Sequence, residues 1–477
     1  MTPSYHRGEP GVKNVALILL VAALCYCSST VSPPAISNVP LKMEAGVYGP
    51  SRTLSEAPGA IGYKNQNILN IALITTPTGS AWVAVPRVWL KIPWGQWDVN
   101  RLDLFRLDSP AAPAPSPVLL EDLLHAQLDP HRFVWASGGN PGDLRLLGQV
   151  QGNFPAGSAL YAQDVPAAGN ASAPRLLPLP GNLPDVIGLE NAVTDASGKT
   201  YIVVEAQDPN YTNRLVYWSY LYHSDDGLQT LKGPFQILVP GPADGKLSQD
   251  YASSDIDIAP DGTLYVAMYV IEPGGVSRVY LLKSRGGETW QVVNRRVAPQ
   301  GQDPFPLLSV DISVDPQGGI HIAYINAAGG IYNRQIMYTY SSDGGLTFST
   351  PVNVLGSRNL SVDVVTARIH NYGQRRYVSW VDDGEDHYVP HTNPFCEHPY
   401  DVVWLTWSDD GAHFHDPVRV SEIADGHNHW ITRSQMQADS GGNLHFAWTS
   451  EWRRLCDPDT SMWKDLQYLF VPKESVH

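Results

Sequence analysis

The residues best suited to chemistry gather in three segments of the C-terminal part of the chain. Acidic side chains and histidines crowd residues 381–401 (VDDGEDHYVPHTNPFCEHPYD), histidine, tryptophan and arginine follow in residues 424–433 (ADGHNHWITR), and a third group occupies residues 450–463 (SEWRRLCDPDTSMW). Aromatic rings stack on sugar rings, while carboxylates and guanidinium groups bind hydroxyl or carboxylate groups. We therefore expect a ligand site here, with the candidate residues His387, Tyr388, His429, Trp430, Arg433, Trp452 and Arg453.

Three interpretations of these residues stay open. In the first, they bind a glycan. In the second, His427 and His429 lie on one side of an extended segment and bind a divalent metal ion, the one cofactor that the sequence suggests. In the third, the loops form a solvated, structurally stiffened surface that holds no small ligand.

Short strands, in which apolar and polar residues alternate, recur along the chain, and they must position these segments. One set consists of SAWVA (80–84), HRFVW, TYIVV, LYVAM, IHIAY, RYVSW and LHFAW (444–448). Several copies follow another strand, such as IDIA or VDISV, and all precede a variable loop and a third strand. Four short antiparallel strands, repeated about seven times, predict an all-β fold, a β-propeller of about seven four-stranded blades, with six as the alternative count. The last unit lacks its fourth strand, so we expect a strand from residues 41–66 to close the ring.

A turn rich in serine, aspartate and glycine follows most of the third strands. YSSDGGLTF (340–348) contains Asp343, and the near-copies YHSDDGLQTL and TWSDDGAHF place Asp225 and Asp409 in the same position, with Arg285 there in LKSRGGETW. An aspartate carboxylate accepts hydrogen bonds from the N–H groups of such a turn. We therefore assign these residues a structural role, with the ring of Phe348 packing against the neighbouring blade.

The stretch SSDGGLTF (341–348) resembles the Asp box, S-x-D-x-G-x-T-F/W, of the sialidase-like (BNR repeat) propellers. The resemblance implies the fold far more than the activity, because Asp boxes occur in sialidases, other glycosidases and non-catalytic propellers. A sialidase also has an arginine in an R-I-P motif, where this chain has Lys91 in LKIP. Only the fold is carried over, and the catalytic residues remain unknown.

Strand alternation assigns the loops to two faces. The first-to-second and third-to-fourth turns share one face, which we call the turn face. The second-to-third loops and the connections between blades share the other, the long-loop face, where long variable loops favour function. Cys396 and Cys456 lie in equivalent long-loop segments of adjacent blades, so we predict a disulfide between them, the alternative being two separate thiols.

The N-terminal residues differ from the rest. A short apolar core, VALILLVAALC (15–25), is typical of an export signal and too short for a spanning helix. We predict a signal in residues 1–29, a linker and ring-closing strand in 30–66, and the propeller in 67–472, with no transmembrane span in the mature chain. A lipid on Cys25 or Cys27, or an uncleaved membrane anchor, is the alternative to simple secretion.

The formal net charge of −15 argues against nucleic acid or an anionic membrane as the main partner. The sequence therefore predicts a secreted or cell-surface propeller that binds a glycan or another extracellular ligand on its long-loop face. If the protein is an enzyme, we expect a divergent sialidase-like glycoside hydrolase. The alternative is a non-catalytic scaffold within a cell-surface protein assembly.

Overall fold

The computed structural model describes the greater part of the chain from Met43 onward. The described residues are 43–49, 51–54, 66–67, 71–76, 79–91, 96–108, 118–121, 127–137, 143–151, 159–166, 172–173, 175–181, 183, 186–207, 217–238, 254–272, 276–298, 310–326, 334–356, 366–383, 401–424, 427–454 and 463–477. For parts of the strands in every blade except the fifth, the backbone alone is described.

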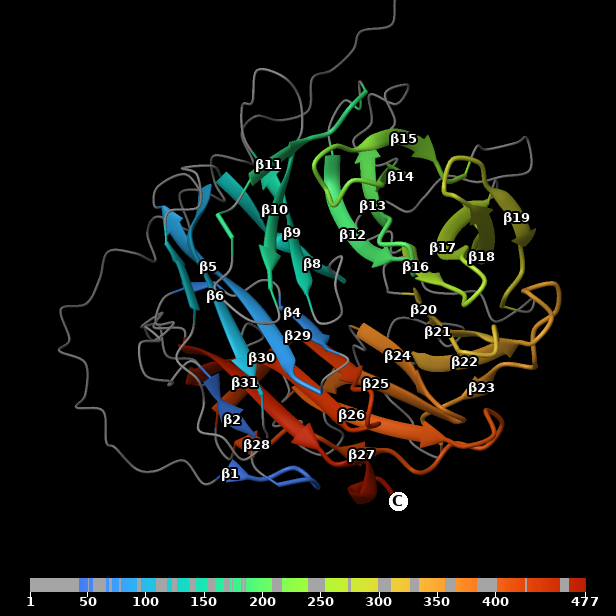
Figure 1. Cartoon of the computed structure of the whole chain (residues 1–477). Helices are drawn as coiled ribbons and strands as arrows, with labels where there is room; N and C mark the ends of the chain where they lie inside the picture. The colour runs from blue at the N-terminus through green and yellow to red at the C-terminus, as the bar shows by residue number, and fades with distance from the viewer. Residues whose placement is uncertain are drawn as a thin grey trace, which may run out of the picture. The chain divides into compact units, whose positions relative to one another are not determined.

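The described residues form seven four-stranded antiparallel blades, which confirms the predicted all-β propeller and sets the blade number at seven rather than six (Figure 1). Blades one to three comprise β4 (Ala72–Thr75), β5 (Ala81–Lys91), β6 (Gln96–Leu107) and β7 (Val118–Glu121); β8 (Gln127–Ser137), β9 (Leu144–Gln151), β10 (Ala159–Val165) and β11 (Arg175–Pro178); and β12 (Val186–Thr194), β13 (Thr200–Gln207), β14 (Tyr217–Ser224) and β15 (Lys232–Gln236).

Blades four to six comprise β16 (Ser254–Ile258), β17 (Thr263–Glu272), β18 (Val276–Arg285) and β19 (Gln291–Asn294); β20 (Val310–Val314), β21 (Ile320–Asn326), β22 (Gln335–Ser341) and β23 (Val352–Asn353); and β24 (Thr366–Tyr372), β25 (Arg375–Asp383), β26 (Asp401–Ser408) and β27 (Val418–Arg419). Blade seven contains β29 (His427–Ala438), β30 (Leu444–Arg454), β31 (Trp463–Val471) and β2 (Arg52–Thr53). The minor elements are β1 (Met43–Glu44), β3 (Gln66–Asn67), β28 (Ile423–Ala424) and the 3-10 helix η3 (Lys473–Ser475).

The first strands of the blades form a closed inner ring. Each contacts the first strand of the next blade, from β4 through β8, β12, β16, β20, β24 and β29 back to β4. The N-terminal strand β2 lies within residues 41–66 and supplies the fourth strand of blade seven, where Arg52 pairs with Tyr468 on β31. The hydroxyl of Ser51 donates to the side-chain oxygen of Gln467 at 2.7 Å beside this pairing.

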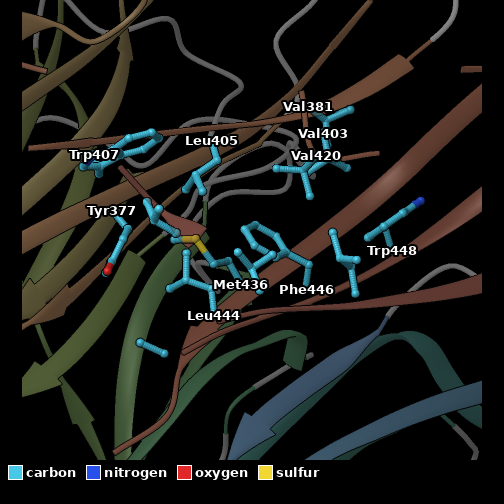
Figure 2. Packing of buried hydrophobic residues seen from close by; sticks show 14 of the residues in the cluster. Tyr377, Val381, Val403, Leu405, Trp407, Val420, Met436, Leu444, Phe446 and Trp448 are labelled. Carbon is cyan, nitrogen blue, oxygen red and sulfur yellow. The ribbon is translucent and has the colours of Figure 1, made fainter. Parts of the chain in front are cut away.

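Apolar side chains between neighbouring blades form the core. Between blades six and seven, for example, Val403 and Leu405 of β26 pack with Met436 of β29 and Phe446 of β30 (Figure 2). Leu54, which follows β2, is fully buried between blades seven and one. Among the described residues, such clusters lie at each junction from that of blades two and three round to that of blades seven and one. Blades three to seven therefore bury both of their faces, which explains why most of the second strands are apolar at consecutive positions.

Carboxylates connect the inner strands where apolar packing ends. Asp255 and Asp257 of β16 accept hydrogen bonds from the backbone N–H groups of Ile312 and Val314 of β20, at 3.0 and 2.6 Å. One blade further on, Asp311 of β20 accepts the N–H of Ile369 of β24 at 2.6 Å. Because the inner edge of a blade has no neighbouring strand in its own sheet, these carboxylates satisfy donors that would otherwise lack a partner.

The turn around Asp343 joins β22 to β23, the third and fourth strands of blade five. Asp343 accepts hydrogen bonds from the hydroxyls of Ser341 and Thr347, at 2.7 and 2.6 Å, and from the N–H of Thr347. These donors, with Thr347 the strongest, lower the pKa of Asp343 to about 2. The side chain of Phe348 packs, half-buried, against the core between blades four and five.

The equivalent aspartates in blades three and six lie one residue later than the sequence alignment placed them. Asp226, not Asp225, accepts hydrogen bonds from Ser224 and Thr230, and Asp410, not Asp409, accepts from Ser408. The counting error arises because both turns contain two consecutive aspartates. The S-x-D spacing of the Asp box selects the second aspartate of each pair, and the hydrogen bond from the serine hydroxyl agrees. Likewise, Gly286 rather than Arg285 holds this position in blade four, where Ser284 donates instead to the Thr289 carbonyl at 2.6 Å.

The misassigned residues make different contacts. Asp225 pairs with Lys232 and with Lys199, whose nitrogen lies 3.4 Å away. Asp409 pairs with Arg375 at 2.7 Å. These are exposed ion pairs at the surface of the turn face, which contribute little to stability.

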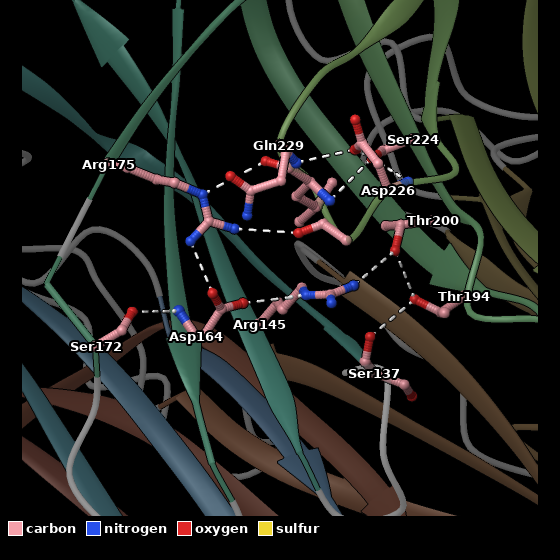
Figure 3. A network of polar contacts seen from close by, with 12 residues as sticks. Ser137, Arg145, Asp164, Ser172, Arg175, Thr194, Thr200, Ser224, Asp226 and Gln229 are labelled. Carbon is pink, nitrogen blue, oxygen red and sulfur yellow. Dashed lines mark hydrogen bonds and ion pairs between the residues drawn. The ribbon is translucent and has the colours of Figure 1, made fainter.

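Two arginines of blade two hold the turn of blade three in place (Figure 3). Arg145 and Arg175 both pair with Asp164, at 3.1 and 2.7 Å, and Arg175 also donates to the carbonyl of Gly227 at 3.2 Å. The next residue, Leu228, has a positive φ of 63° and donates its N–H to Ser224. Because a leucine rarely adopts this conformation, the surrounding contacts must hold the turn.

Substitution of adjacent aspartates will test this assignment. We expect Asp226→Ala to lower the melting temperature clearly, because four hydrogen bonds that close the turn lose their acceptor. Asp225→Ala is the matched control and should change it much less, because it removes two ion pairs with exposed or half-buried lysines and one 3.5 Å contact with His223. Thermal unfolding of both variants gives the comparison, and an equal or reversed order would contradict the assignment.

Candidate functional site

The predicted site residues fall into two groups. His387, Tyr388, Cys396 and Cys456 lie outside the described residues, and the predicted disulfide stays a prediction. His429, Trp430 and Arg433 belong to β29, and Trp452 and Arg453 to β30, where the backbone is described. The fold therefore brings these five into one hairpin of blade seven.

Strand register places several of them opposite one another. His429 pairs with Trp452 on β30, which in turn pairs with Trp463 on β31. These three positions form one row across three adjacent strands, and directly opposed residues lie on the same face of a sheet. The next row contains Trp430, Glu451 and Lys464, on the opposite face. Trp463 was not among the predicted residues, although it lies in the same segment as Trp452.

The His427 end of β29 lies at the long-loop face, because a first strand enters its blade from there. Nine residues of β29 precede Met436, whereas two residues of β20 precede the equivalent Ile312. The equivalence rests on the strand register, since Ile312 pairs with Ile322 and Met436 with Phe446, the middle residues of the repeated second strands IHIAY and LHFAW. Blade seven thus carries its innermost strand further toward the long-loop face than blade five does.

The same register defines a set of equivalent inner-strand positions, here called the axial layer. Asp311, Arg368 and Gln435 pair with the fourth residue of the repeated second strand, so these three residues occupy equivalent positions in consecutive blades. Asn191 and Asp255 extend the layer to blades three and four, and the amide of Asn191 donates to Asp255 at 2.5 Å. The sequence-predicted Trp430 lies five residues before Gln435 on β29 and is not part of this layer.

The electrostatics of the axial layer centre on one arginine. Arg368 donates to Asp311 at 2.9 Å, and about a quarter of its side chain is exposed. Burial alone would lower the pKa of Arg368, but Asp311 and Asp255 together raise it. Burial, assisted by the charge of Asp311, raises the pKa of Asp255 well above its usual range. The layer therefore holds a permanent cation beside carboxyl groups, of which Asp255 resists ionisation.

Two further inner-strand groups titrate away from their usual range. Burial raises the pKa of Asp257 to about 6, although the N–H groups of Val314 and Ile258 oppose this. Burial also lowers the pKa of His370, two residues beyond Arg368, to about 4. The imidazole of His370 is therefore neutral at pH 7, so the cation of this strand is Arg368.

A divalent metal has no donor set in the part of the chain that the structure describes. No group of three or more His, Cys, Asp or Glu side chains lies there in an arrangement that could hold an ion. For His427 and His429 the register shows only that they are two residues apart on β29, hence on the same face of the strand. Among the described residues, moreover, no helix is long and apolar enough to cross a membrane.

Two Asp–His–Tyr groups resemble catalytic triads but are structural. His321 contacts the hydroxyl of Tyr338 at 2.7 Å and Asp315 at 3.1 Å. His445 makes the same contacts with Tyr468 and Asp439, at 2.7 and 3.3 Å. Both histidines are buried, and they occupy equivalent positions in blades five and seven, beside first-to-second turns. A group repeated from blade to blade and closed to solvent stabilises the blade rather than acting on a substrate.

Comparisons with known proteins support the fold. No protein-family model matches the chain, and no curated protein matches it. A solved polysaccharide lyase of family PL25, an ulvan lyase bound to -[GlcA(1-4)Rha3S]-, shares 12% identity at a TM-score of 0.52, covering 86% of this chain and 95% of its own. At this identity the likeness shows the fold alone.

Two other glycan-active propellers resemble the chain more distantly. A Hadza microbial sialidase shares 14% identity over 67% of this chain and 65% of its own, at a TM-score of 0.42. An endo-arabinase from Bacteroides thetaiotaomicron shares 13% over 60% of this chain and 92% of its own, at 0.36.

The pH dependence of stability will test the structural role of His321. Burial, with a further effect of Arg376, lowers the pKa of His321 to about 4 from its ordinary 6.5, so the unfolded chain binds the proton more readily. Stability should therefore fall as the pH drops from about 6.5 toward 4, by on the order of 1–3 kcal/mol for this group.

Unfolding measured at pH 7 and pH 5 gives the comparison. We expect His321→Gln to reduce the stability difference between the two pH values. The opposite contribution of Asp257, whose pKa is raised to about 6, is common to all the proteins compared and cancels. An unaltered difference in His321→Gln would show that His321 does not titrate in this range.

Proposed function

We propose that this propeller binds a glycan on its long-loop face, at blade seven. The observation that carries the proposal is the row formed by His429, Trp452 and Trp463 across β29, β30 and β31. Consecutive aromatic positions on one sheet face suit a flat, extended ligand, because sugar rings stack on aromatic rings. The proposed site lies at the His427 end of β29, the end that faces the long loops.

The axial layer adds a polar group suited to the same ligand. Arg368 lies on β24, the strand that neighbours β29, at the position that Gln435 holds on β29. A guanidinium group binds hydroxyl or carboxylate oxygens, and its pairing with Asp311 fixes its orientation. We therefore propose that the glycan extends from the aromatic row of blade seven toward this arginine.

If the protein is an enzyme, we propose that it processes the glycan that it binds. Neighbours in the structure comparison include a lyase, a sialidase and an arabinase, which makes a glycan-active role plausible for this chain at the level of the fold. Neither a nucleophile nor a general acid is assigned, because His387 and Tyr388 lie outside the described residues. Export of the chain, as predicted from residues 1–29, would give it access to extracellular glycans.

A non-catalytic scaffold is the second candidate. The closed Asp–His–Tyr groups and the structural aspartate turns show how much of the polar chemistry in this chain serves the fold. A scaffold would use the same long-loop face to meet another protein. The two candidates differ in whether the aromatic row contacts sugar.

A glycan array followed by titration will test the proposal. The full chain should bind members of the array, and Trp452→Ala or Trp463→Ala should weaken binding by roughly 1–3 kcal/mol, the range for loss of one aromatic stacking contact. The matched control is Leu346→Ala, which removes an exposed apolar side chain from the turn face and should leave binding unchanged. Addition of a chelator should have no effect if the ligand is held without metal.

Two results would contradict the proposal. Absence of binding to any glycan in the array, with the fold intact, would favour the scaffold. Loss of metal uptake in His427→Ala and His429→Ala, with no change in glycan binding in the tryptophan variants, would favour the metal site instead.

A further inference from the structure

Blade six departs from the repeat at two paired positions of its first and second strands. Ser379, the fourth residue of RYVSW, corresponds by register to apolar residues in blades three, four, five and seven, namely Val203, Ala267, Ala323 and Ala447. Its pairing partner on the inner strand is Arg368, where blades four and five have an aspartate. The fold therefore requires neither the hydroxyl of Ser379 nor the cation of Arg368.

Strand alternation directs both side chains toward blade seven. Ser379 lies between Tyr377 and Val381, which belong to the apolar core of the junction between blades six and seven, so the three side chains share one face of blade six. Arg368 is directly opposite Ser379 and lies on the same face.

Blade seven presents a second polar pair to the same junction. Trp448 belongs to this core (Figure 2), and its partner on β29 is Ser434. Trp448 is the fifth residue of LHFAW and Ser379 the fourth residue of RYVSW, so the two pairs lie at neighbouring levels of facing sheets. The inner ends of blades six and seven thus bring together an arginine, two serines and an indole.

Each of these four side chains has a buried polar atom without a hydrogen-bond partner in the described part of the chain. The atoms are Nε of Arg368, Oγ of Ser379, Oγ of Ser434 and Nε1 of Trp448. The two serines and the tryptophan are at most 3% exposed, so bulk solvent does not reach them. Because a buried donor without an acceptor is costly, four at one junction indicate a bound partner.

The junction lacks acceptors rather than donors. Guanidinium and indole nitrogens only donate, and each serine hydroxyl has a proton to donate. The N–H of Met436 corresponds by register to that of Ile312, which Asp255 accepts one blade pair earlier. Arg368 holds the aspartate position at this junction and has no acceptor to offer, so the bound partner must supply acceptors.

We propose that the junction of blades six and seven binds a small inorganic anion, held by Arg368, Ser379, Ser434 and Trp448. A halide or a sulfate accepts hydrogen bonds from several directions, which suits donors that come from both blades, and a charged acceptor strengthens each bond. This site does not depend on the proposed glycan function.

The surroundings favour a small ion that can enter from solvent. Leu405 and Phe446 pack on the same two faces and limit the site to a few atoms. About a quarter of the Arg368 side chain is exposed, which gives access to the guanidinium group. Nη1 of Arg368 stays paired with Asp311 at 2.9 Å, so neutral donors supply most of the site. An anion held there joins β24 to β29.

Crystals of the full chain grown with bromide or with selenate will locate the anion through the anomalous signal of bromine or selenium. We expect a peak within hydrogen-bond distance of Nε of Arg368 and Nε1 of Trp448, and the two salts distinguish a halide from an oxyanion. Ordered water at these atoms in both crystals, without an anomalous peak, overturns the proposal.

Thermal unfolding gives an independent measurement in solution. Chloride or sulfate, whichever the crystals support, should raise the melting temperature by on the order of 3 °C at about 100 times its Kd. Ser434→Ala and Trp448→Phe each remove one donor and should lose most of this shift.

The matched control is Ser254→Ala. Ser254 pairs with Met268 and so holds on β16 the position of Ser434, but its hydroxyl lies 3.1 Å from that of Ser219. This variant should keep the full shift. An equal shift in the wild type and all three variants would be a general salt effect and would overturn the proposal. No glycan enters either experiment, so the outcome is independent of the proposed function.

Discussion

The inner edge of each blade sets the central constraint on this structure. The first strand of a blade has no partner of its own sheet on the inner side, so half of its N–H groups need acceptors from elsewhere. Aspartates of the preceding blade meet this need at Ile312, Val314 and Ile369. Their burial is tolerable because each carboxylate receives backbone donors, and the apolar cores between blades can then pack without unsatisfied polar groups.

The repeat is broken in blade six. An aspartate at the position of Arg368 would continue the pattern, and the chain instead places a cation there, which pairs with Asp311. A carboxylate of a different strand, Asp401 of β26, accepts a β29 N–H nearer the long-loop face, that of Ile431. Local rules in a protein tend to be broken at functional sites and compensated nearby.

The sequence predicted the architecture well and the polar network poorly. Strand alternation and repeated turns were enough for the seven blades, since each blade repeats the same apolar pattern. The one-residue error at Asp225 and Asp409 arose because the first of two adjacent aspartates was aligned with Asp343, although the S-x-D spacing and the contacts both select the second. The motifs IDIA and VDISV placed Asp257 and Asp311 within strands. Their role as acceptors could not be predicted, because the N–H groups that they accept belong to the next blade. Trp463 likewise became a candidate site residue only because the strand register pairs it with Trp452.

Closure of the ring by β2 has a consequence for how the protein is made. Ser51 and its partner Gln467 stand 416 positions apart, so β2 is synthesised early but cannot complete blade seven until β31 has been made. Contacts of such long sequence separation form slowly, and partly folded chains expose unpaired strand edges. Until β31 is made, the growing chain must therefore carry an open arc of blades.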